Sequence, residues 1–280
     1  MRFTKMHGLG NDFVLVDAAD VRSRDAVELA RAVCGRRTGV GADGLILIGP
    51  SARADARMTI YNADGSRPQM CGNGVRCVAK WIVERDGCRS PVVRIETDCG
   101  VKDATCDVVD GRVRLVRVDM GAPSLDARAM PTTLDVRRVV NHAVHIDGVA
   151  YVLTCVSMGN PHAVIFVDDV GKIALDRVGR RIECAPIFPE RINVHFVQPV
   201  SDVRVRIGTW ERGAGATRAC GTGACAVCVA GAITDRTSRS ITATLPGGEL
   251  DIEWNRDGDH VYMTGLATEV FAGDWPVRRR

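Results

Sequence analysis

Hydrophobic residues along this chain stand mostly in short runs that glycine, proline and polar residues separate. Short runs bounded by turn residues are typical of β-strands, and the alternation of hydrophobic and charged residues over 203–207 indicates a strand with one buried face. We expect strands over residues 13–16, 45–48, 58–61, 92–95, 113–118, 203–207, 241–245 and 250–254.

Three segments have the spacing of α-helices instead. In residues 25–34 the hydrophobic residues recur at helical intervals, and Gly35 follows the last of them. In residues 75–85 the charged residues recur at every fourth position on one face while hydrophobic residues cover the others, which predicts a mostly buried helix. Residues 224–233 are apolar on all sides, as expected for a helix that its domain encloses.

Together these elements predict an α+β fold made of two domains. Strands separated by tight turns favour mainly antiparallel sheets, and each half of the chain adds a central helix. A length of 280 residues suits two domains of medium size. We place the halves at residues 1–119 and 120–266, with the boundary near Gly121, and expect residues 267–280 to complete the sheet of the first half.

A Cys-Gly-x-Gly motif, in which x is any residue, occurs twice, each time before a predicted helix. The sequence is Cys-Gly-Asn-Gly at 71–74 and Cys-Gly-Thr-Gly at 220–223, and nine residues before each cysteine a polar motif begins, with Asn62 in the first half and Glu211 in the second. Self-similarity over this distance indicates two related halves rather than a short-period repeat. Each half therefore delivers one thiol to the start of a helix.

This repeated pattern points to a particular chemistry. A helix N-terminus lowers the pKa of a thiol through its dipole and its N–H groups, and the same N–H groups hold a carboxylate well. Two thiols on opposite faces of one carbon can remove a proton from one face and return a proton to the other. Cys71 and Cys220 are thus candidates for the acid and base of a racemase or epimerase.

Composition and charge narrow the classes of function. The net charge is only +3 and the charges of both signs are interspersed, so nothing favours binding of nucleic acid or of an anionic membrane. The arginines at 278–280 are interpreted as a solvent-exposed terminus. The first residues do not form a signal peptide, and the longest apolar run, 224–233, has about half the length of a membrane span. We therefore expect a soluble cytoplasmic protein.

Cofactor motifs are not expected in this chain. The eleven cysteines fit free thiols better than a disulfide framework, and the pair Cys225 and Cys228 lies inside an apolar helix without a second pair to complete a zinc site. Glycines at 39, 41 and 44 match a dinucleotide fingerprint, but a predicted helix precedes them and a strand follows, the reverse of the required order. None of the four lysines stands in a pyridoxal phosphate motif. We expect neither a cofactor nor a metal.

Several motifs, in their order and spacing, closely resemble the diaminopimelate epimerase family. The resemblance runs from residue 8 to about residue 230. The motifs are Gly-Leu-Gly-Asn-Asp-Phe at 8–13, Asn-Ala-Asp-Gly-Ser at 62–66, Cys-Gly-Asn-Gly-Val-Arg-Cys at 71–77, Gly-Asn-Pro-His at 159–162, Asn-Val at 193–194, and Glu-Arg-Gly-Ala-Gly at 211–215 leading to Ala-Cys-Gly-Thr-Gly at 219–223.

The resemblance implies a cofactor-independent epimerase that interconverts LL- and meso-2,6-diaminopimelate in the synthesis of lysine and of peptidoglycan precursors. It also implies two pseudo-symmetric domains, each a sheet or barrel wrapped around a central helix, with the substrate in the cleft between them. A homodimer is expected on the same ground, with diaminopimelate as the partner and neither nucleic acid nor a membrane.

The resemblance also assigns roles to single residues. Cys71 and Cys220 are the thiolate and thiol pair, Glu211 together with the backbone near Arg212 holds the reacting ammonium group, and His162 lies close to the thiols. The reacting carboxylate is held by backbone N–H groups of Gly72, Asn73, Gly221 and Thr222. The distal end of the substrate is held by the side chains of Asn11, Asn62, Asn160, Asn193 and Arg212.

The chain departs from the family pattern at a few positions. Gly44 stands where some members carry a glutamine that contacts substrate, Met70 where glutamine is frequent, and Ala216 where many members have glutamate. Thr222 replaces a serine of some members and keeps the hydroxyl. None of these changes affects the two thiols.

Simpler interpretations exist for the individual residues. A single asparagine such as Asn62 fits an ordinary turn, Glu211 and Arg212 fit a surface ion pair, and His162 fits a core histidine. His7 and Arg76 are interpreted as structural. At the level of function, the alternatives are another two-cysteine racemase, such as a proline or hydroxyproline racemase, and a thiol-based binding or redox protein. A small imino acid offers no distal amino-acid end for Asn62, Asn160, Asn193 and Arg212 to hold.

Overall fold

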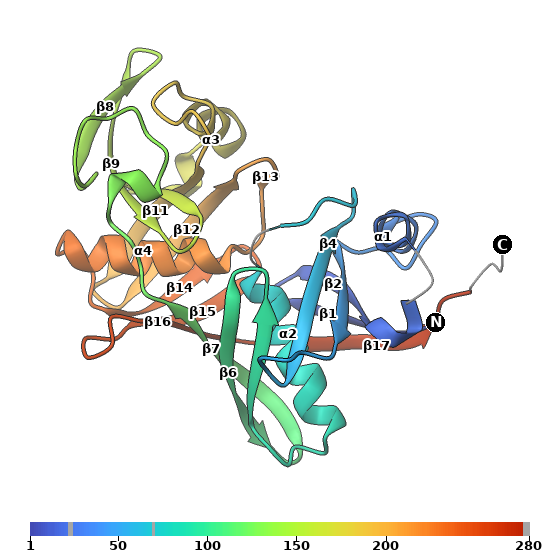
Figure 1. Ribbon diagram of the computed structural model, residues 1–280. Coiled ribbons are helices and arrows are strands. Elements are labelled where there is room, and N and C mark those ends of the chain that lie inside the picture. The colour runs from blue at the N-terminus through green and yellow to red at the C-terminus, as the bar shows by residue number, and fades with distance from the viewer. Residues whose placement is uncertain (22–24, 69–70, 277–280) are drawn as a thin grey trace. The chain divides into compact units, whose positions relative to one another are not determined.

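The structure is a computed structural model that describes residues 1–21, 25–68 and 71–276. Met70 and the arginines at 278–280 lie outside the described residues. The chain divides into two compact units (Figure 1). Unit 1 comprises Met1–Val118 and Gly265–Arg280, and unit 2 comprises Asp119–Thr264.

Unit 1 is a mixed sheet with two α-helices. Its strands pair in the order β17-β1-β2-β3-β4-β5-β6-β7, and only the pairs β2·β3 and β4·β5 are parallel. The elements are β1 (Arg2–Gly8), β2 (Asn11–Asp17), a 3-10 turn (Ala18–Val21), α1 (Ala26–Cys34), β3 (Gly44–Gly49), β4 (Ala56–Asn62), α2 (Gly72–Arg85), β5 (Val92–Thr97), β6 (Gly100–Val109), β7 (Arg112–Gly121) and β17 (Thr268–Asp274).

Unit 2 repeats this plan. Its strands pair in the order β8-β9-β10-β11-β12-β14-β15-β16, only β10·β11 and β12·β14 are parallel, and the short β13 adds to β12. The elements are a 3-10 turn (Ala127–Ala129), β8 (His142–Ile146), β9 (Val149–Ser157), β10 (Pro161–Phe166), a 3-10 turn (Val170–Lys172), α3 (Leu175–Glu183), β11 (Asn193–Ser201), β12 (Arg204–Glu211), β13 (Gly215–Ala216), α4 (Gly221–Ile233), β14 (Ser240–Leu245), β15 (Gly248–Trp254) and β16 (Val261–Gly265).

The order of antiparallel and parallel pairs is the same in both units. In each unit the first parallel pair is bridged by a short helix, α1 or α3, and the second by the helix that follows the repeated cysteine, α2 or α4. A parallel pair requires such a crossover connection, whereas antiparallel neighbours need only a turn. The predicted pseudo-symmetric α+β plan with mainly antiparallel sheets is confirmed, and the repeat extends to the strand topology.

Each cysteine-led helix is surrounded by the sheet of its own unit. Helix α2 contacts β1, β2, β4, β5 and β6, and α4 contacts β9, β10, β11, β14 and β15, so four of the five contacts in each unit are with equivalent strands. Residues Gly221–Gly231 of α4 are all buried, as the apolar sequence predicts. Both helices begin three residues earlier than the predicted ranges, because the glycine-rich segment after each cysteine already forms the first turn.

The charged stripe of α2 faces inward rather than toward solvent. Arg76 and Lys80 are buried, whereas Trp81 and Ile82 are only half-buried. The Lys80 ammonium donates to Glu84 Oε1 at 2.6 Å and to the Val113 carbonyl at 2.8 Å. Buried charges persist in proteins when they are paired in this way. The periodicity of the sequence identified the charged face of α2, but it did not show that this face points into the unit.

Several elements were not predicted. Strands β1, β6, β8, β9, β10, β11, β13 and β16 and helix α3 lie outside the expected ranges. Helix α3 was missed because it contains Gly179 and more charged than hydrophobic residues. Strand β17 pairs with β1 in unit 1, and the backbone of Trp275 exchanges hydrogen bonds with Met1.

The glycine motif at 39–44 forms a turn between α1 and β3, so the predicted helix-before-strand order is confirmed. A Cβ at Gly39 would overlap the carbonyl oxygens of Ala32 and Val33, which explains the glycine by close packing on the end of α1. In the described part of the chain, no helix combines the length and the apolar character that crossing a membrane requires.

Candidate functional site

In unit 1, Cys71 occupies the N-cap position of α2. Its backbone is extended (φ −144°, ψ 93°), its side chain is half-buried, and its Sγ accepts a hydrogen bond from the Gly74 backbone N–H at 3.3 Å. A Cβ at Gly74 would lie 3.1 Å from both Ile46 Cδ1 and Met58 Cε. This glycine therefore allows the first turn of α2, and the thiol with it, to sit directly on β3 and β4.

Asn11, at the start of β2, lies beside this thiol. Its Nδ2 donates to Asp43 Oδ2 at 2.8 Å, and its Oδ1 accepts from Asn73 Nδ2 at 3.2 Å. These two bonds fix the orientation of the amide. The same Oδ1 lies 3.9 Å from Cys71 Sγ, where it can accept the thiol proton. The structure thus brings together three of the predicted residues of unit 1.

Four charged residues that the sequence analysis did not single out hold Asn11 in place. Arg36 donates to Asp12 at 2.9 Å and to Asp43 at 2.7 Å, and Lys5 Nζ donates to Asp12 Oδ2 at 2.6 Å and to the Gly41 carbonyl. The backbone N–H of each aspartate donates to the carboxylate of the other at 3.0 Å. Burial raises the pKa of Asp12, but the hydrogen bonds from Arg36 and Lys5 outweigh burial and hold the pKa at about 2.

Arg76 also supports the site from within α2. It is fully buried, its Nη2 donates to Asn73 Oδ1 at 2.9 Å, and its Nε donates to the Leu266 carbonyl at 3.2 Å. Arg76 therefore orients the Asn73 amide, which in turn orients Asn11. The structural interpretation of Arg76 is consistent with these contacts, and they tie it directly to the Cys71 environment.

Asn62 has a local partner instead. Its Nδ2 donates to Ser66 Oγ at 2.9 Å, and its backbone N–H donates to the Ser66 carbonyl, so the residue closes its own turn. At the nearby start of β3, a Cβ on Gly44 would lie 2.8 Å from the Tyr61 carbonyl oxygen. The backbone leaves no room here for the glutamine side chain considered above.

In unit 2, Cys220 is the N-cap residue of α4, with extended backbone angles (φ −122°, ψ 104°) similar to those of Cys71. The side chain is buried, and its Sγ lies 3.7 Å from Thr222 Oγ1. Burial, followed by the negative charge of Glu211, raises the pKa of the Cys220 thiol well above its usual range.

Glu211 and Arg212 do not form the simple surface pair considered above. Glu211 ends β12 and accepts a hydrogen bond from Thr217 Oγ1 at 2.5 Å, while the Arg212 guanidinium donates to the Glu190 carbonyl at 3.2 Å. The Arg212 backbone N–H donates to Asn193 Oδ1 at 2.9 Å. These bonds tie the end of β12 to Thr217, to Glu190 and to Asn193 at the start of β11.

Asn193 is buried and joins two segments of backbone. Besides accepting from Arg212, it donates from Nδ2 to the Pro161 carbonyl at 2.8 Å. This amide therefore holds the start of β10 against the end of β12. The structure places Asn160 and His162, which flank Pro161, within the same cluster as Glu211 and Cys220.

A chain of polar contacts leads from Cys220 into the core of unit 2. Thr222 Oγ1 accepts from Asn160 Nδ2 at 3.4 Å, and Asn160 Oδ1 lies 2.9 Å from His162 Nε2. The chain then continues through residues that the sequence analysis missed. His162 Nδ1 lies 2.9 Å from His195 Nε2, and His195 Nδ1 lies 3.0 Å from Thr209 Oγ1.

The predicted carboxylate-binding groups sit at equivalent positions in the two units. Gly72 and Asn73 open α2, and Gly221 and Thr222 open α4. The first N–H groups of an α-helix have no acceptor within the helix and carry the positive end of its dipole. Each unit therefore offers an N-terminal helix turn suited to an anionic group beside its thiol.

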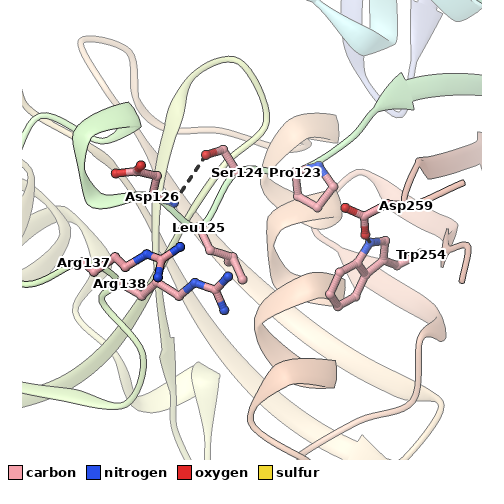
Figure 2. A pocket seen from close by; sticks show the side chains of 8 residues that line it. All are labelled: Pro123, Ser124, Leu125, Asp126, Arg137, Arg138, Trp254 and Asp259. Atoms are coloured by element: carbon pink, nitrogen blue, oxygen red, sulfur yellow. Dashed lines mark hydrogen bonds between the residues drawn. The ribbon is translucent and has the colours of Figure 1, made fainter.

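Two other features of unit 2 lie apart from this chemistry. Cys225 and Cys228 are both buried inside α4, and no group of three or more His, Cys, Asp or Glu side chains among the described residues is placed to hold a metal. A pocket of about 260 Å³ is lined by residues that include Leu125, Arg137 and Trp254, whose side chains are drawn in Figure 2. It contains none of the predicted site residues.

Comparison with known proteins decides the family. The family model described as diaminopimelate epimerase matches residues 3–125 and 154–270. This chain belongs to the diaminopimelate epimerase family. A diaminopimelate epimerase from Moorella thermoacetica is 49% identical over 278 residues, which cover 99% of this chain and 100% of that protein. One from Acetivibrio thermocellus is 47% identical over 274 residues, 98% of each chain.

Solved structures add a wider relationship of fold. A probable proline racemase from Agrobacterium radiobacter superposes with a TM-score of 0.71 at 18% sequence identity, over 99% of this chain and 93% of that chain. The TM-score shows that the two chains share a fold, and at this low sequence identity the match carries no argument about substrate. Membership of the diaminopimelate epimerase family makes the chain an isomerase by class, and the racemase alternative survives only as a relative in fold.

Proposed function

We propose that this chain interconverts LL- and meso-2,6-diaminopimelate without a cofactor, using Cys71 and Cys220 on opposite faces of one α-carbon. The observation that carries the proposal is the equivalent placement of one cysteine at the N-cap of the enclosed helix in each pseudo-symmetric unit. Membership of the family supports the choice of substrate. We infer that residues 1–119 with 267–280 and residues 120–266 are the two halves of the enzyme.

The proposed reaction balances through the two sulfur atoms. One cysteine, as the thiolate, takes the α-proton and becomes a thiol, while the other, as the thiol, delivers its proton to the opposite face and becomes a thiolate. The reverse reaction exchanges these roles. The helix N-termini at Gly72 and Asn73 and at Gly221 and Thr222 are the proposed holders of the reacting carboxylate, where they stabilise the charge that develops on it.

Glu211 gives the substrate a role in activating Cys220. In the free enzyme the carboxylate of Glu211 is one cause of the raised pKa of the Cys220 thiol, after burial. A substrate ammonium group bound to Glu211 compensates this negative charge, so the thiol becomes more acidic when substrate is present. The backbone near Arg212 is the proposed second contact of the ammonium group.

The distal amino-acid end of the substrate is assigned to polar side chains of both units. Asn160 and Asn193 belong to the hydrogen-bonded cluster beside Cys220, and Asn11 belongs to the one beside Cys71. Each amide keeps unused donor or acceptor capacity, since an amide group offers two N–H donors and two lone pairs. The proposed distal contacts are the side chains of Asn11, Asn62, Asn160, Asn193 and Arg212, with His162 assisting near the thiols.

We also propose that the enzyme acts in the cytoplasm, as a homodimer, in the synthesis of lysine and peptidoglycan precursors. Support for the compartment comes from the eleven cysteines, which form no disulfide in the described residues, since free thiols fit a reducing environment. The dimer and the pathway rest on the family. Size-exclusion chromatography with light scattering tests the dimer directly.

Proton NMR tests the proposed activity. Reduced, metal-free protein is incubated with LL-diaminopimelate in D2O, with L-proline and trans-4-hydroxy-L-proline in parallel samples. The expected result is loss of one α-proton signal with conversion to the meso isomer, and no exchange with either imino acid. Exchange of proline in place of diaminopimelate would replace the substrate assignment, and inertness toward all three would overturn it.

A further inference from the structure

We propose that His195 and Thr209 are positioning residues for Cys220, acting through a one-way chain of hydrogen bonds that ends at its sulfur atom. The inference rests on the proposed function, because it assigns a purpose to a buried cluster behind the second thiol. His162 and His195 are both fully buried, and Thr209 is 1% exposed. Burial of a polar cluster of this size costs free energy unless every polar group has a hydrogen-bond partner. The pattern of partners therefore indicates what the cluster does.

The direction of the chain follows from the amide of Asn160. Its Nδ2 faces Thr222 Oγ1 at 3.4 Å and its Oδ1 faces His162 Nε2 at 2.9 Å. An amide oxygen only accepts, so His162 must carry its proton on Nε2. Burial, reinforced by the proximity of His195 and then of Arg212, holds the pKa of His162 well below its usual range, so the ring is neutral and Nδ1 is an acceptor.

The same logic passes to the next ring. His195 Nε2 must donate to His162 Nδ1 across 2.9 Å, and burial lowers the pKa of His195 to about 3, so its Nδ1 is an acceptor as well. Thr209 then donates its hydroxyl proton to His195 Nδ1 across 3.0 Å. Every proton from Thr209 to Asn160 therefore points toward the thiol.

At the other end the chain reaches the sulfur atom. Thr222 Oγ1 accepts from Asn160, which leaves the hydroxyl proton of Thr222 available to Cys220 Sγ at 3.7 Å. A hydroxyl that donates to sulfur stabilises the thiolate over the thiol. The inferred purpose of the chain is to keep this hydroxyl proton turned toward Cys220 when that residue acts as the base.

Packing gives a second and independent sign that His195 serves the helix turn at Cys220. A Cβ placed on Gly223 would overlap the His195 ring, so the imidazole lies directly against the first turn of α4. The second glycine of the Cys-Gly-Thr-Gly motif is thus required by this ring. His195 therefore supports the turn sterically and orients the chain of hydrogen bonds.

Without His195 or Thr209 the direction of the chain is no longer fixed. His162 can then adopt the other tautomer, whose unprotonated Nε2 faces Asn160 Oδ1, and two acceptors in contact repel each other. The Asn160 amide turns in response and Thr222 reorients its proton. The predicted consequence is a Cys220 thiol that is harder to ionise, with the fold retained.

The decisive test combines tautomer and pH measurements on matched variants. Two-bond 15N–1H NMR of histidine-labelled enzyme should show two imidazoles in the neutral Nε2–H form that do not titrate between about pH 5 and pH 8. Their assignment comes from His195→Gln and His162→Gln. Detection of the Nδ1–H tautomer, or titration of either ring in this range, would contradict the inference whether or not the enzyme acts on diaminopimelate.

Thr209→Val and Thr209→Ser provide the functional control, because valine has the shape of threonine and serine keeps its hydroxyl. Thr209→Val should move the acid limb of the pH profile of kcat to higher pH and lower kcat about threefold to tenfold near neutral pH, the effect of one lost hydrogen bond. Thr209→Ser should restore the wild-type profile. Equal profiles for the two variants, or a changed KM alone, would reduce Thr209 to a packing role.

Two substitutions of His195 provide a second test, which does not depend on Thr209. Glutamine places an N–H close to the position of the imidazole Nε2–H, whereas leucine fills similar space without a donor. His195→Gln should keep most of the acid-limb position, and His195→Leu should shift it to higher pH, with circular dichroism unchanged in both. A larger shift for glutamine than for leucine would overturn the proposal.

Discussion

Cys71 and Cys220 occupy equivalent backbone positions but different surroundings. Cys71 is half-buried, accepts a hydrogen bond from the Gly74 N–H and lies beside the oxygen of Asn11. Cys220 is buried and lies beside the hydroxyl of Thr222. The repeated topology supplies the shared helix N-terminus, and side chains from neighbouring strands set the chemistry of each thiol.

The supports behind the two thiols also differ in kind. In unit 1 the charged network of Lys5, Asp12, Arg36 and Asp43 fixes Asn11. In unit 2 neutral imidazoles and hydroxyls extend from Cys220 into the core. Paired charged side chains are tolerated where some solvent reaches them. Complete burial of neutral polar groups costs less free energy than complete burial of charged ones. Burial does not account for the whole difference, because Lys5 and Arg76, which support the Cys71 site, are both charged and buried.

The largest expected effect concerns the thiols themselves. Cys71→Ser and Cys220→Ser should each lower kcat for epimerisation by about 10²- to 10⁴-fold, because each removes one proton-transfer group of suitable acidity. Cys184→Ser, at an exposed cysteine of unit 2, is the matched control and should leave turnover unchanged. Loss of activity in only one of these two variants would contradict the two-thiol account.

Glu211→Gln should separate substrate binding from thiol acidity. Removal of the carboxylate should lower kcat/KM about tenfold to 100-fold, the effect of losing a hydrogen bond to a charged group. The pKa of the free Cys220 thiol should fall at the same time, because the charge of Glu211 helps to raise it. The pH dependence of Cys220 alkylation, followed by peptide mass spectrometry, measures this pKa. Glu190→Gln, at an exposed neighbour, is the control, and an unchanged or higher Cys220 pKa in Glu211→Gln would refute the coupling.

The buried histidines should make the free energy of unfolding fall in acid. The unfolded chain binds a proton at each histidine below about pH 6.5, whereas folded His195 resists protonation until its pKa of about 3. Stability from this group is complete above pH 6.5 and is lost between pH 6.5 and pH 3, at about 1.4 kcal/mol per pH unit. Urea unfolding at pH 7, 6, 5 and 4 should show a shallower loss for His195→Gln, and an identical slope would contradict this.

The charged support of unit 1 has its own acid signature at lower pH. The pKa of Asp12 is depressed to about 2, so its contribution is present above about pH 4 and is lost as the pH falls toward 2. Asp12→Asn should cost about 2 kcal/mol at pH 7 in urea unfolding. Asp126 also has a pKa of about 2, but its side chain is 39% exposed and its ion-pair partner Arg128 is 90% exposed, so Asp126→Asn should change stability little. Equal effects of the two substitutions would remove Asp12 from the support of the site.

The sequence identified the parts of this site that repeat. The cysteines, the helix starts and the pseudo-symmetric plan follow from local patterns, since glycine-flanked cysteines before apolar segments are visible in one dimension. Strands β10 and β11 escaped prediction although they carry His162 and His195. Their polar residues interrupt the hydrophobic runs, and the partners of these residues are distant in sequence.

The sequence also did not predict whether a polar side chain points into the core or toward solvent. Arg76 and Lys80 appear in the sequence as one charged face of a helix, yet both are buried and hydrogen-bonded. His195 stands two residues after the motif residue Asn193 in an otherwise hydrophobic segment, which is its only sequence signal. Its contact with Gly223 joins residues from β11 and α4, and only the fold creates it.

The most direct test of the two-thiol account follows the origin of the hydrogen on the product. LL-diaminopimelate is incubated with enzyme in D2O, and the α-positions of substrate and product are analysed by mass spectrometry during the first few per cent of conversion. Two separate thiols predict meso product that carries one solvent deuterium while the remaining substrate is still unlabelled. Product that retains the original α-hydrogen would show that one group moves the proton between both faces, and would contradict the account.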